Sequence, residues 1–253
     1  MSLPRSGTRS MVVRTLPTER LSGPLQMGLD DALLVAASKG QATFRFYEWS
    51  QPTLSLGYFQ HAADRQNDPH LDGVAFVRRP SGGGAILHHL ELTYTLALPA
   101  GQSWQPAGRS WACRFHGILI QALAEFGVHA RAVACGEERK LGPFLCFEHQ
   151  TAGDLLLGEH KIVGSAQRRL HGATMQHGSI LLEQSPHTPS LPGIAECAGI
   201  RIAPRELEAV ISRQLLADTG WEFQPGEWAD WEHPHAQEQI AARFENPDWN
   251  EKR

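Results

Sequence analysis

Apolar residues recur at helical spacing in three parts of the chain. Leucine occupies every fourth position early in residues 24–39, and Gly40 follows as a helix stop, so we predict a helix there. A second apolar face runs from about Arg109 to Phe126. Behind Pro204, apolar residues again follow helical spacing. The segment 186–253 is therefore predicted to be mostly helical.

Short runs of β-branched, aromatic and aliphatic residues predict strands between these helices. In the run 92–98, apolar and polar residues alternate, so one of its faces should be buried. Strands and helices are mixed without regular βαβ alternation, which predicts an α/β (α+β) fold in which helices flank a mixed β-sheet. The predicted strands are 43–49, 53–59, 74–77, 92–98, 154–157, 161–166 and 175–182.

Composition narrows the class of protein. The chain has 253 residues, of which 42% are apolar and 20% charged, which is typical of a globular protein. The net charge of −4 argues against general binding to nucleic acid or membrane surfaces. No apolar segment follows the basic N-terminal residues Arg5 and Arg9, and no run is long enough to cross a membrane. We therefore expect a cytoplasmic protein with reduced thiols.

A run of three glycines is the most prominent local motif. Gly82, Gly83 and Gly84 follow Arg79 and Ser81. Contiguous glycines cost backbone entropy and are useful where the backbone must approach a ligand closely. Arg79 could supply a fixed positive charge, although a flexible surface loop explains the glycines equally well. The spacing matches neither a phosphate-binding P-loop nor a dinucleotide-binding fingerprint.

Lys161 and Cys146 are the next candidates. Lys161 lies in an apolar strand, where it could anchor a carbonyl or carboxylate, or could simply extend to solvent. Cys146 has apolar flanks, so it is either a core thiol or a thiol activated by a cation such as Lys161. Cys113 is interpreted as packing in its helix. Cys135 and Cys197 are left unassigned, and no two of the four cysteines form a C-x-x-C pair.

The thirteen histidines do not predict a metal site. His88 and His89 would point to opposite faces of a strand, so they cannot chelate simply. His171 and His177 have no acidic residue at a familiar ligand spacing. Solvated or hydrogen-bonded histidines are the simpler interpretation.

Six segments in order resemble the lipoate–protein ligase and octanoyltransferase family. They cover about residues 20–185, and Trp249-Asn250 is similar to the family's ending. The resemblance implies a single catalytic domain over 1–253, with the biotin/lipoate ligase fold, a family core at 20–185 and a helical segment at 186–253. The resembling segments are 27–34, 52–60, 78–88, 91–94, 161–167 and 176–182.

The resemblance also implies a site around an acyl chain held in a tunnel. Cys146 would be the nucleophile and Lys161 its catalytic partner, with no metal. Oxyanion donors could come from the backbone near 82–84 or 161–164. The implied substrate-binding residues are Arg79, Ser81, Gly82, Gly83, Gly84, His88, Gly164, Ser165, Ala166 and His177.

Three activities occur in this family. A transferase moves octanoyl from acyl carrier protein to a lysine of a lipoyl domain through a cysteine thioester, without a cofactor. A ligase makes an acyl-adenylate with ATP and Mg²⁺, and an amidotransferase moves the acyl group between lipoyl domains. The acceptor would be the glycine cleavage H protein or a 2-oxoacid dehydrogenase E2.

The transferase is favoured because residues 91–94 and Cys146 match that branch, and because the chain leaves no room for a ligase accessory domain. Gly84 is more ligase-like, and Gly153 departs from the usual pattern before Asp154. A non-catalytic scaffold that binds lipoyl domains is a further alternative.

Overall fold

The main sheet is mixed, as the sequence predicts. The computed structural model describes residues 10–101 and 110–252. The strand order is β14-β1-β3-β7-β13-β12-β11-β8, with β2 paired to β3. The pairings of β1 with β14 and β3, and of β2 with β3, are parallel, whereas the other pairings are antiparallel. The strands are β1 (Val12–Thr15), β2 (Glu19–Leu21), β3 (Ala42–Trp49), β7 (Glu91–Leu98), β8 (Arg131–Ala132), β11 (Leu155–Leu157), β12 (His160–Leu170), β13 (Ala173–Leu181) and β14 (Glu222–Pro225).

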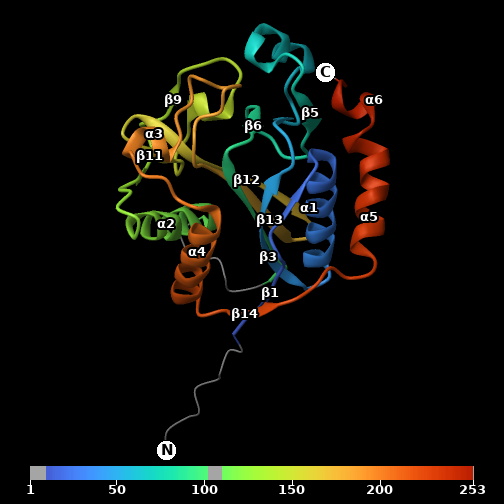
Figure 1. Cartoon of the computed structure of the whole chain (residues 1–253). Coiled ribbons are helices and arrows are strands. Elements are labelled where there is room, and N and C mark those ends of the chain that lie inside the picture. The colour runs from blue at the N-terminus through green and yellow to red at the C-terminus, as the bar shows by residue number, and fades with distance from the viewer. Residues whose placement is uncertain (1–9, 102–109, 253) are drawn as a thin grey trace, which may run out of the picture.

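A second, smaller sheet lies at one end of the main sheet (Figure 1). In it, β4 (Thr53–Leu56) runs parallel to β5 (Ala75–Arg78) and antiparallel to β6 (Ile86–His88). The short strands β9 (Arg139–Lys140) and β10 (His149–Gln150) form a two-stranded pair. The segment that leads to Cys146 lies beside β6, because Ala85 and Leu145 form a parallel bridge.

Helices cover both faces of the main sheet. Helices α1 (Gly23–Ser38), α5 (Glu232–Gln239) and α6 (Pro247–Asn250) lie on one side, and α2 (Trp111–Ala124), α3 (Ile194–Ala198) and α4 (Pro204–Thr219) on the other (Figure 1). A π-helical turn, Ile240–Phe244, continues α5. Within the described ranges, no helix is both long and apolar enough to cross a bilayer.

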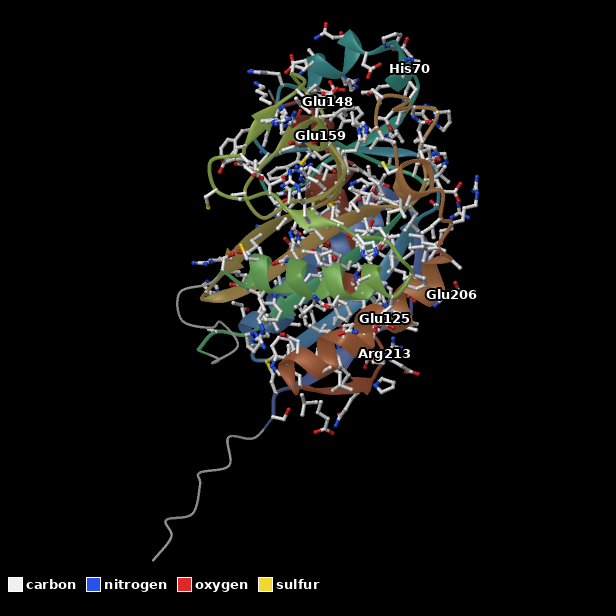
Figure 2. All side chains as sticks on the ribbon, turned by 90° about the vertical axis from the view of Figure 1, so that its left-hand side faces the viewer. His70, Glu125, Glu148, Glu159, Glu206 and Arg213 are labelled. Carbon is white, nitrogen blue, oxygen red and sulfur yellow. The ribbon has the colours of Figure 1, made fainter. Side chains whose placement is uncertain are left out.

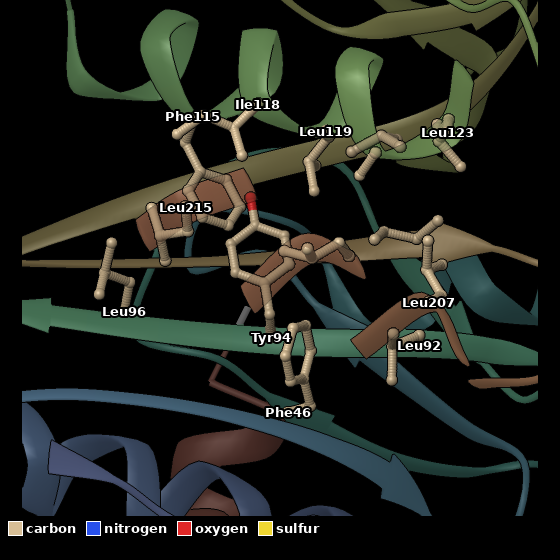
Figure 3. Packing of buried hydrophobic residues seen from close by; sticks show 14 of the residues in the cluster. Phe46, Leu92, Tyr94, Leu96, Phe115, Ile118, Leu119, Leu123, Leu207 and Leu215 are labelled. Atoms are coloured by element: carbon tan, nitrogen blue, oxygen red, sulfur yellow. The ribbon is translucent and has the colours of Figure 1, made fainter. Parts of the chain in front are cut away.

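The largest hydrophobic cluster lies between the main sheet and the layer formed by α2 and α4. Phe46 and Tyr94 project from the sheet toward Phe115 and Leu119 of α2, and Leu215 of α4 closes the cluster (Figure 3). On the surface, Arg213 of α4 pairs with Glu125 at the end of α2 (Figure 2). This core fixes one face of the strands whose other face forms the site.

Most of the predicted helices and strands are confirmed, and the structure adds the short strands β1, β2, β6, β8, β9 and β10, which were not predicted. The predicted strand 53–59 ends at Leu56, because residues 57–60 turn into a loop. The segment after 186 also contributes β14, a strand missed because its pairing with β1 is distant in sequence. Cys113 was interpreted as packing, but its side chain is exposed and receives a hydrogen bond from Ser110. The predicted start of α2 at Arg109 lies outside the described residues.

Candidate functional site

The structure brings Lys161 and Cys146 together. The Nζ of Lys161 is 3.6 Å from the Sγ of Cys146 and 2.7 Å from Oδ2 of Asp154. It also donates to the carbonyls of Cys146, at 3.2 Å, and of His149, at 3.0 Å. The Lys161 side chain is 2% exposed, so its ammonium is held by a carboxylate and carbonyls rather than by water. A buried cation next to a half-buried thiol stabilises negative charge on the sulfur.

A β-bulge directs Lys161 toward the site. In the pairing of β11 with β12, Leu155 lies opposite Val163 but Leu156 lies opposite Lys161, so Ile162 is an additional residue in β12. Ile162 and Val163 are both buried in the main hydrophobic cluster. After the bulge, Gly164 lies on the Lys161 side, because a Cβ at Gly164 would be 2.8 Å from Cε of Lys161. The bulge thus aims a cation out of an apolar strand.

A steric contact explains why the third residue of the glycine loop (residues 82–84) is Gly84. The amide of Cys146 donates to the carbonyl of Ala85 at 2.7 Å, and the amide of Ala85 donates to the carbonyl of Phe144 at 3.1 Å. A Cβ at Gly84 would lie 2.9 Å from the nitrogen of Cys146 and 3.0 Å from its Cα. Gly84 is therefore needed wherever the Cys146 segment pairs this closely. Since the amides of Ala85 and Cys146 are engaged in this pairing, neither is available to an oxyanion.

Arg79 holds the glycine loop from inside. It is 2% exposed and donates to the carbonyls of Ser55, at 2.7 Å, Gly82, at 2.9 Å, and Gly84, at 2.6 Å. Burial lowers the pKa of Arg79 to about 10, against a smaller opposing effect of Cys146, so Arg79 remains a cation at neutral pH. Its Nε is buried and has no hydrogen-bond partner among the described residues. Buried donors usually have a partner, so this nitrogen is a candidate to bind a substrate atom.

A small cavity lies next to this group. Of the predicted substrate-binding residues, Arg79, His88, Gly164, Ala166 and His177 line it. The rest of its lining is largely apolar and aromatic, which suits an acyl chain; each buried CH₂ contributes about 0.8 kcal/mol. These further lining residues are Met27, Tyr47, Trp49, Ser55, Ile86, Thr93, Gly178 and Ser179.

The polar groups at the cavity wall are paired with one another. Ser81 contacts Nε2 of His177 at 2.8 Å, and Nδ1 of His177 is 3.4 Å from Asp30. Burial tends to raise the pKa of Asp30, but Arg45 and His177 together hold it below its usual value. These pairs keep the wall rigid without isolated charges.

His88 forms a second paired group at this wall. It contacts Glu91 at 2.5 Å and Ser55 at 2.8 Å, and it stacks on Trp49 with ring centroids 3.8 Å apart. His88 is thus held at the cavity wall by hydrogen bonds and by stacking.

Ser165 lies on the other face of β12, away from the cavity. Its hydroxyl contacts the Tyr94 hydroxyl at 2.6 Å and Nε2 of His116. His116 of α2 also contacts the carbonyl of Gly153, next to Asp154, with its Nδ1 at 2.5 Å. Ser165 thus helps to support the strand that carries Lys161, rather than lining the cavity.

Sequence reasoning missed Asp154, His116, Asp30 and Glu91. Asp154 is the first residue of the predicted strand 154–157, and it receives hydrogen bonds from the amide and hydroxyl of Thr151 at 2.7 and 2.8 Å. The signal for His116 was a polar side chain on the otherwise apolar face of α2. Asp30 and Glu91 lie inside segments that the family resemblance already covered. The partners of Asp30 are distant in sequence, whereas Glu91 contacts the nearby His88 as well as the distant Ser179.

The fold is that of lipoate ligase catalytic domains. The chain superposes on a crystal structure of lipoate-protein ligase A bound with ATP, with a TM-score of 0.77 and 21% identity, covering 95% of this chain and 99% of that one. It also superposes on a putative lipoate protein ligase from T. acidophilum with bound lipoic acid, with a TM-score of 0.77 and 19% identity, covering 96% and 100%.

The family follows from the sequence comparison. The family described as the lipoyl protein ligase A/B catalytic domain matches residues 23–190, and the chain belongs to it. The chain is 31% identical to the octanoyltransferase LipM of Kyrpidia tusciae, over 94% of this chain and 97% of that protein. It is 30% identical to the octanoyltransferase LipM of Brevibacillus brevis, over 95% and 99%. The predicted family and fold are confirmed.

The close approach of Gly84 to Cys146 yields a test. In Gly84→Ala, the added Cβ displaces the Cys146 segment, and we expect kcat/KM for acyl transfer to fall by about 100-fold. Gly82→Ala is the matched variant, because a Cβ there meets Phe59 at 3.9 Å, an ordinary contact. Steady-state kinetics of both variants checks this, and equal losses would contradict it.

Burial of His116 predicts a pH dependence of stability. Burial lowers its pKa below the usual 6.5 of a histidine, against smaller opposing effects of the Gly153 carbonyl and Asp154. Near and below pH 6.5 the unfolded chain therefore binds more protons at this site than the folded chain does. The free energy of unfolding should therefore decrease as the pH is lowered below 6.5, by at most about 1.4 kcal/mol per pH unit.

The comparison is between the wild type and His116→Gln, in urea denaturation at pH 7.5 and 5.5. The variant should lose less stability between the two pH values, because its side chain does not titrate. An equal loss in both proteins would contradict the assignment.

Proposed function

We propose that this protein transfers an octanoyl group from acyl carrier protein to a lysine of a lipoyl domain, through a thioester on Cys146. The observation that carries the proposal is the Cys146 thiol lying 3.6 Å from the buried Lys161 ammonium. Relatives named octanoyltransferase LipM, which match nearly the whole chain, support the same reaction.

In the first step, Cys146 attacks the carbonyl carbon of the donor thioester. Lys161 stabilises negative charge on Sγ, and the buried cations Lys161 and Arg79 stabilise the oxyanion that forms. The new bond joins Sγ to the acyl carbon. The bond to the carrier sulfur breaks, and the carrier leaves as a thiol with the proton that Cys146 gives up. The product is an acyl-enzyme.

In the second step, the uncharged amine of the acceptor lysine attacks the same carbon. A C–N bond forms, the bond to Sγ breaks, and the amine proton returns to Cys146. The product is an amide, which is more stable than the thioester that it replaces. The acyl chain stays in the cavity throughout, which keeps the carbonyl fixed between Lys161 and Arg79.

We propose that the reaction needs no cofactor, because the donor thioester already activates the acyl group. The alternative is an ATP- and Mg²⁺-dependent ligase, which the triple glycine favoured at first. The steric contact of Gly84 with Cys146 accounts for that glycine without ATP. A second alternative is transfer between lipoyl domains through the same cysteine.

The acceptor is proposed to be a lipoyl domain of the glycine cleavage H protein or of a 2-oxoacid dehydrogenase E2. A structural neighbour with a TM-score of 0.72 and 18% identity belongs to an archaeal lipoylation system, where a bipartite lipoate protein ligase is described with its E2 lipoyl domain. That neighbour supports the class of acceptor; which of the two acceptors this chain serves is for assay to decide.

Intact-mass analysis tests the proposal. Octanoyl acyl carrier protein should add one octanoyl group to the chain, and peptide mapping should locate it on Cys146. Cys146→Ser should lower transfer to a lipoyl domain by more than about a thousandfold. Cys113→Ser is the matched control, since that thiol is exposed and outside the site, and its activity should equal that of the wild type.

Two further incubations separate the alternatives. One replaces the donor with free octanoate or lipoate, ATP and Mg²⁺, and the other with an octanoylated lipoyl domain. Product from free acid and ATP, with none from the carrier, would overturn the transferase in favour of the ligase. An adduct from the acylated lipoyl domain alone would establish the amidotransferase instead.

A further inference from the structure

Arg78, next to the glycine loop, is bound by two segments distant in sequence. Its side chain is fully buried. The guanidinium donates to the carbonyls of Gly57, at 3.0 Å, and Gln60, at 2.7 Å. From the other direction it donates to the carbonyls of Trp249, at 3.1 Å, and Asn250, at 2.8 Å. The Arg78 cation therefore joins the C-terminal tail, Trp249 and Asn250, to the loop of residues 57–60 that follows β4 (Figure 1).

The tail also binds the backbone of Arg78. The amide of Arg78 donates to Oδ1 of Asn250 at 2.8 Å, and the indole Nε1 of Trp249 donates to the carbonyl of Arg78 at 2.9 Å. Nδ2 of Asn250 donates to the carbonyl of Phe244 at 2.9 Å, so the tail is itself fixed to the π-helical turn. The side chains of Trp249 and Asn250 thus pair with both the amide and the carbonyl of Arg78 at the end of β5.

The loop that Arg78 holds reaches the Cys146 segment. Gln60 accepts from the amide of Gly57 at 2.9 Å, and its Nε2 donates to the carbonyl of Phe144 at 3.0 Å. Phe144 is the residue whose carbonyl also pairs with Ala85, beside Cys146. A Cβ at Gly57 would lie 1.9 Å from the carbonyl oxygen of Gly83. The loop therefore supports the glycine loop and the nucleophile segment together.

We propose that Trp249 and Asn250 are positioning residues for Cys146, acting through Arg78 and the 57–60 loop. The inference rests on the proposed function, since it concerns the step in which Cys146 is acylated. When the tail is released, Arg78 loses the carbonyls of Trp249 and Asn250 as acceptors. The 57–60 loop, which binds Phe144 through Gln60, is then held less firmly. Cys146 then moves relative to Lys161, while the acyl cavity keeps the part of its wall that comes from β7, β12 and β13.

The test compares Asn250→Ala with Glu251→Ala. Asn250 is buried and bound to Arg78, whereas Glu251 is exposed and adjacent to it in the chain. We expect Asn250→Ala to slow single-turnover acylation of Cys146 by octanoyl acyl carrier protein by at least about tenfold. Glu251→Ala should acylate at the wild-type rate. Asn250→Asp keeps the acceptor for the Arg78 amide but lacks the donor to the Phe244 carbonyl, so it should recover part of the lost rate.

Two measurements distinguish positioning from a loss of fold. Alkylation of Cys146 by iodoacetamide reports on the thiol alone, and it should slow in Asn250→Ala at temperatures well below the melting transition. KM for the donor should change less than kcat, since the acyl cavity is retained. If Asn250→Ala acylates and alkylates at wild-type rates, the inference is wrong. If the wild type forms no adduct on Cys146, the proposed function is wrong instead.

Discussion

The ion pair of Lys161 with Asp154 is the interaction on which the site depends. Burying an ammonium costs several kcal/mol, and this cost is offset only because a carboxylate and two carbonyls surround it. Asp154 is fixed in turn by Thr151, and its neighbour Gly153 is fixed by His116. The Lys161 charge beside Cys146 therefore depends on a chain of hydrogen bonds that extends to His116 of α2. Such a site suits chemistry in which negative charge develops at one fixed place.

Backbone contact closer than a side chain allows is the second constraint. Gly84 must approach Cys146, Gly164 must approach Lys161, and Gly57 must approach Gly83. The contacts of Gly84 and Gly57 join segments that are distant in the chain, whereas Gly164 and Lys161 lie three residues apart in β12. The glycines that suggested ligand binding in the sequence thus serve first to let the protein pack against itself.

Much of the fold could be predicted from periodicity, because α1, α2, β3 and β7 have strong local patterns. The candidate site could be predicted only in part. Cys146 and Lys161 were candidates by residue type, and the family resemblance supplied their roles. Their contact, however, depends on the bulge at Ile162, which no spacing in β12 reveals. Asp154 and His116 were visible as residue types, yet their partners lie on other elements. Strand β14 was missed because its partner β1 is at the other end of the chain.

Arg78 and Arg79 are adjacent at the end of a strand, and their side chains bind different parts of the fold. Arg79 faces the cavity and binds carbonyls of the glycine loop, whereas Arg78 binds the tail and the 57–60 loop. Successive side chains at a strand end point to opposite sides, so two cations hold the same backbone from two directions. Because backbone carbonyls accept most of these bonds, the loop is shaped before substrate arrives. The Arg79 cation is then already fixed at the cavity wall, and the site needs little reorganisation when a ligand binds.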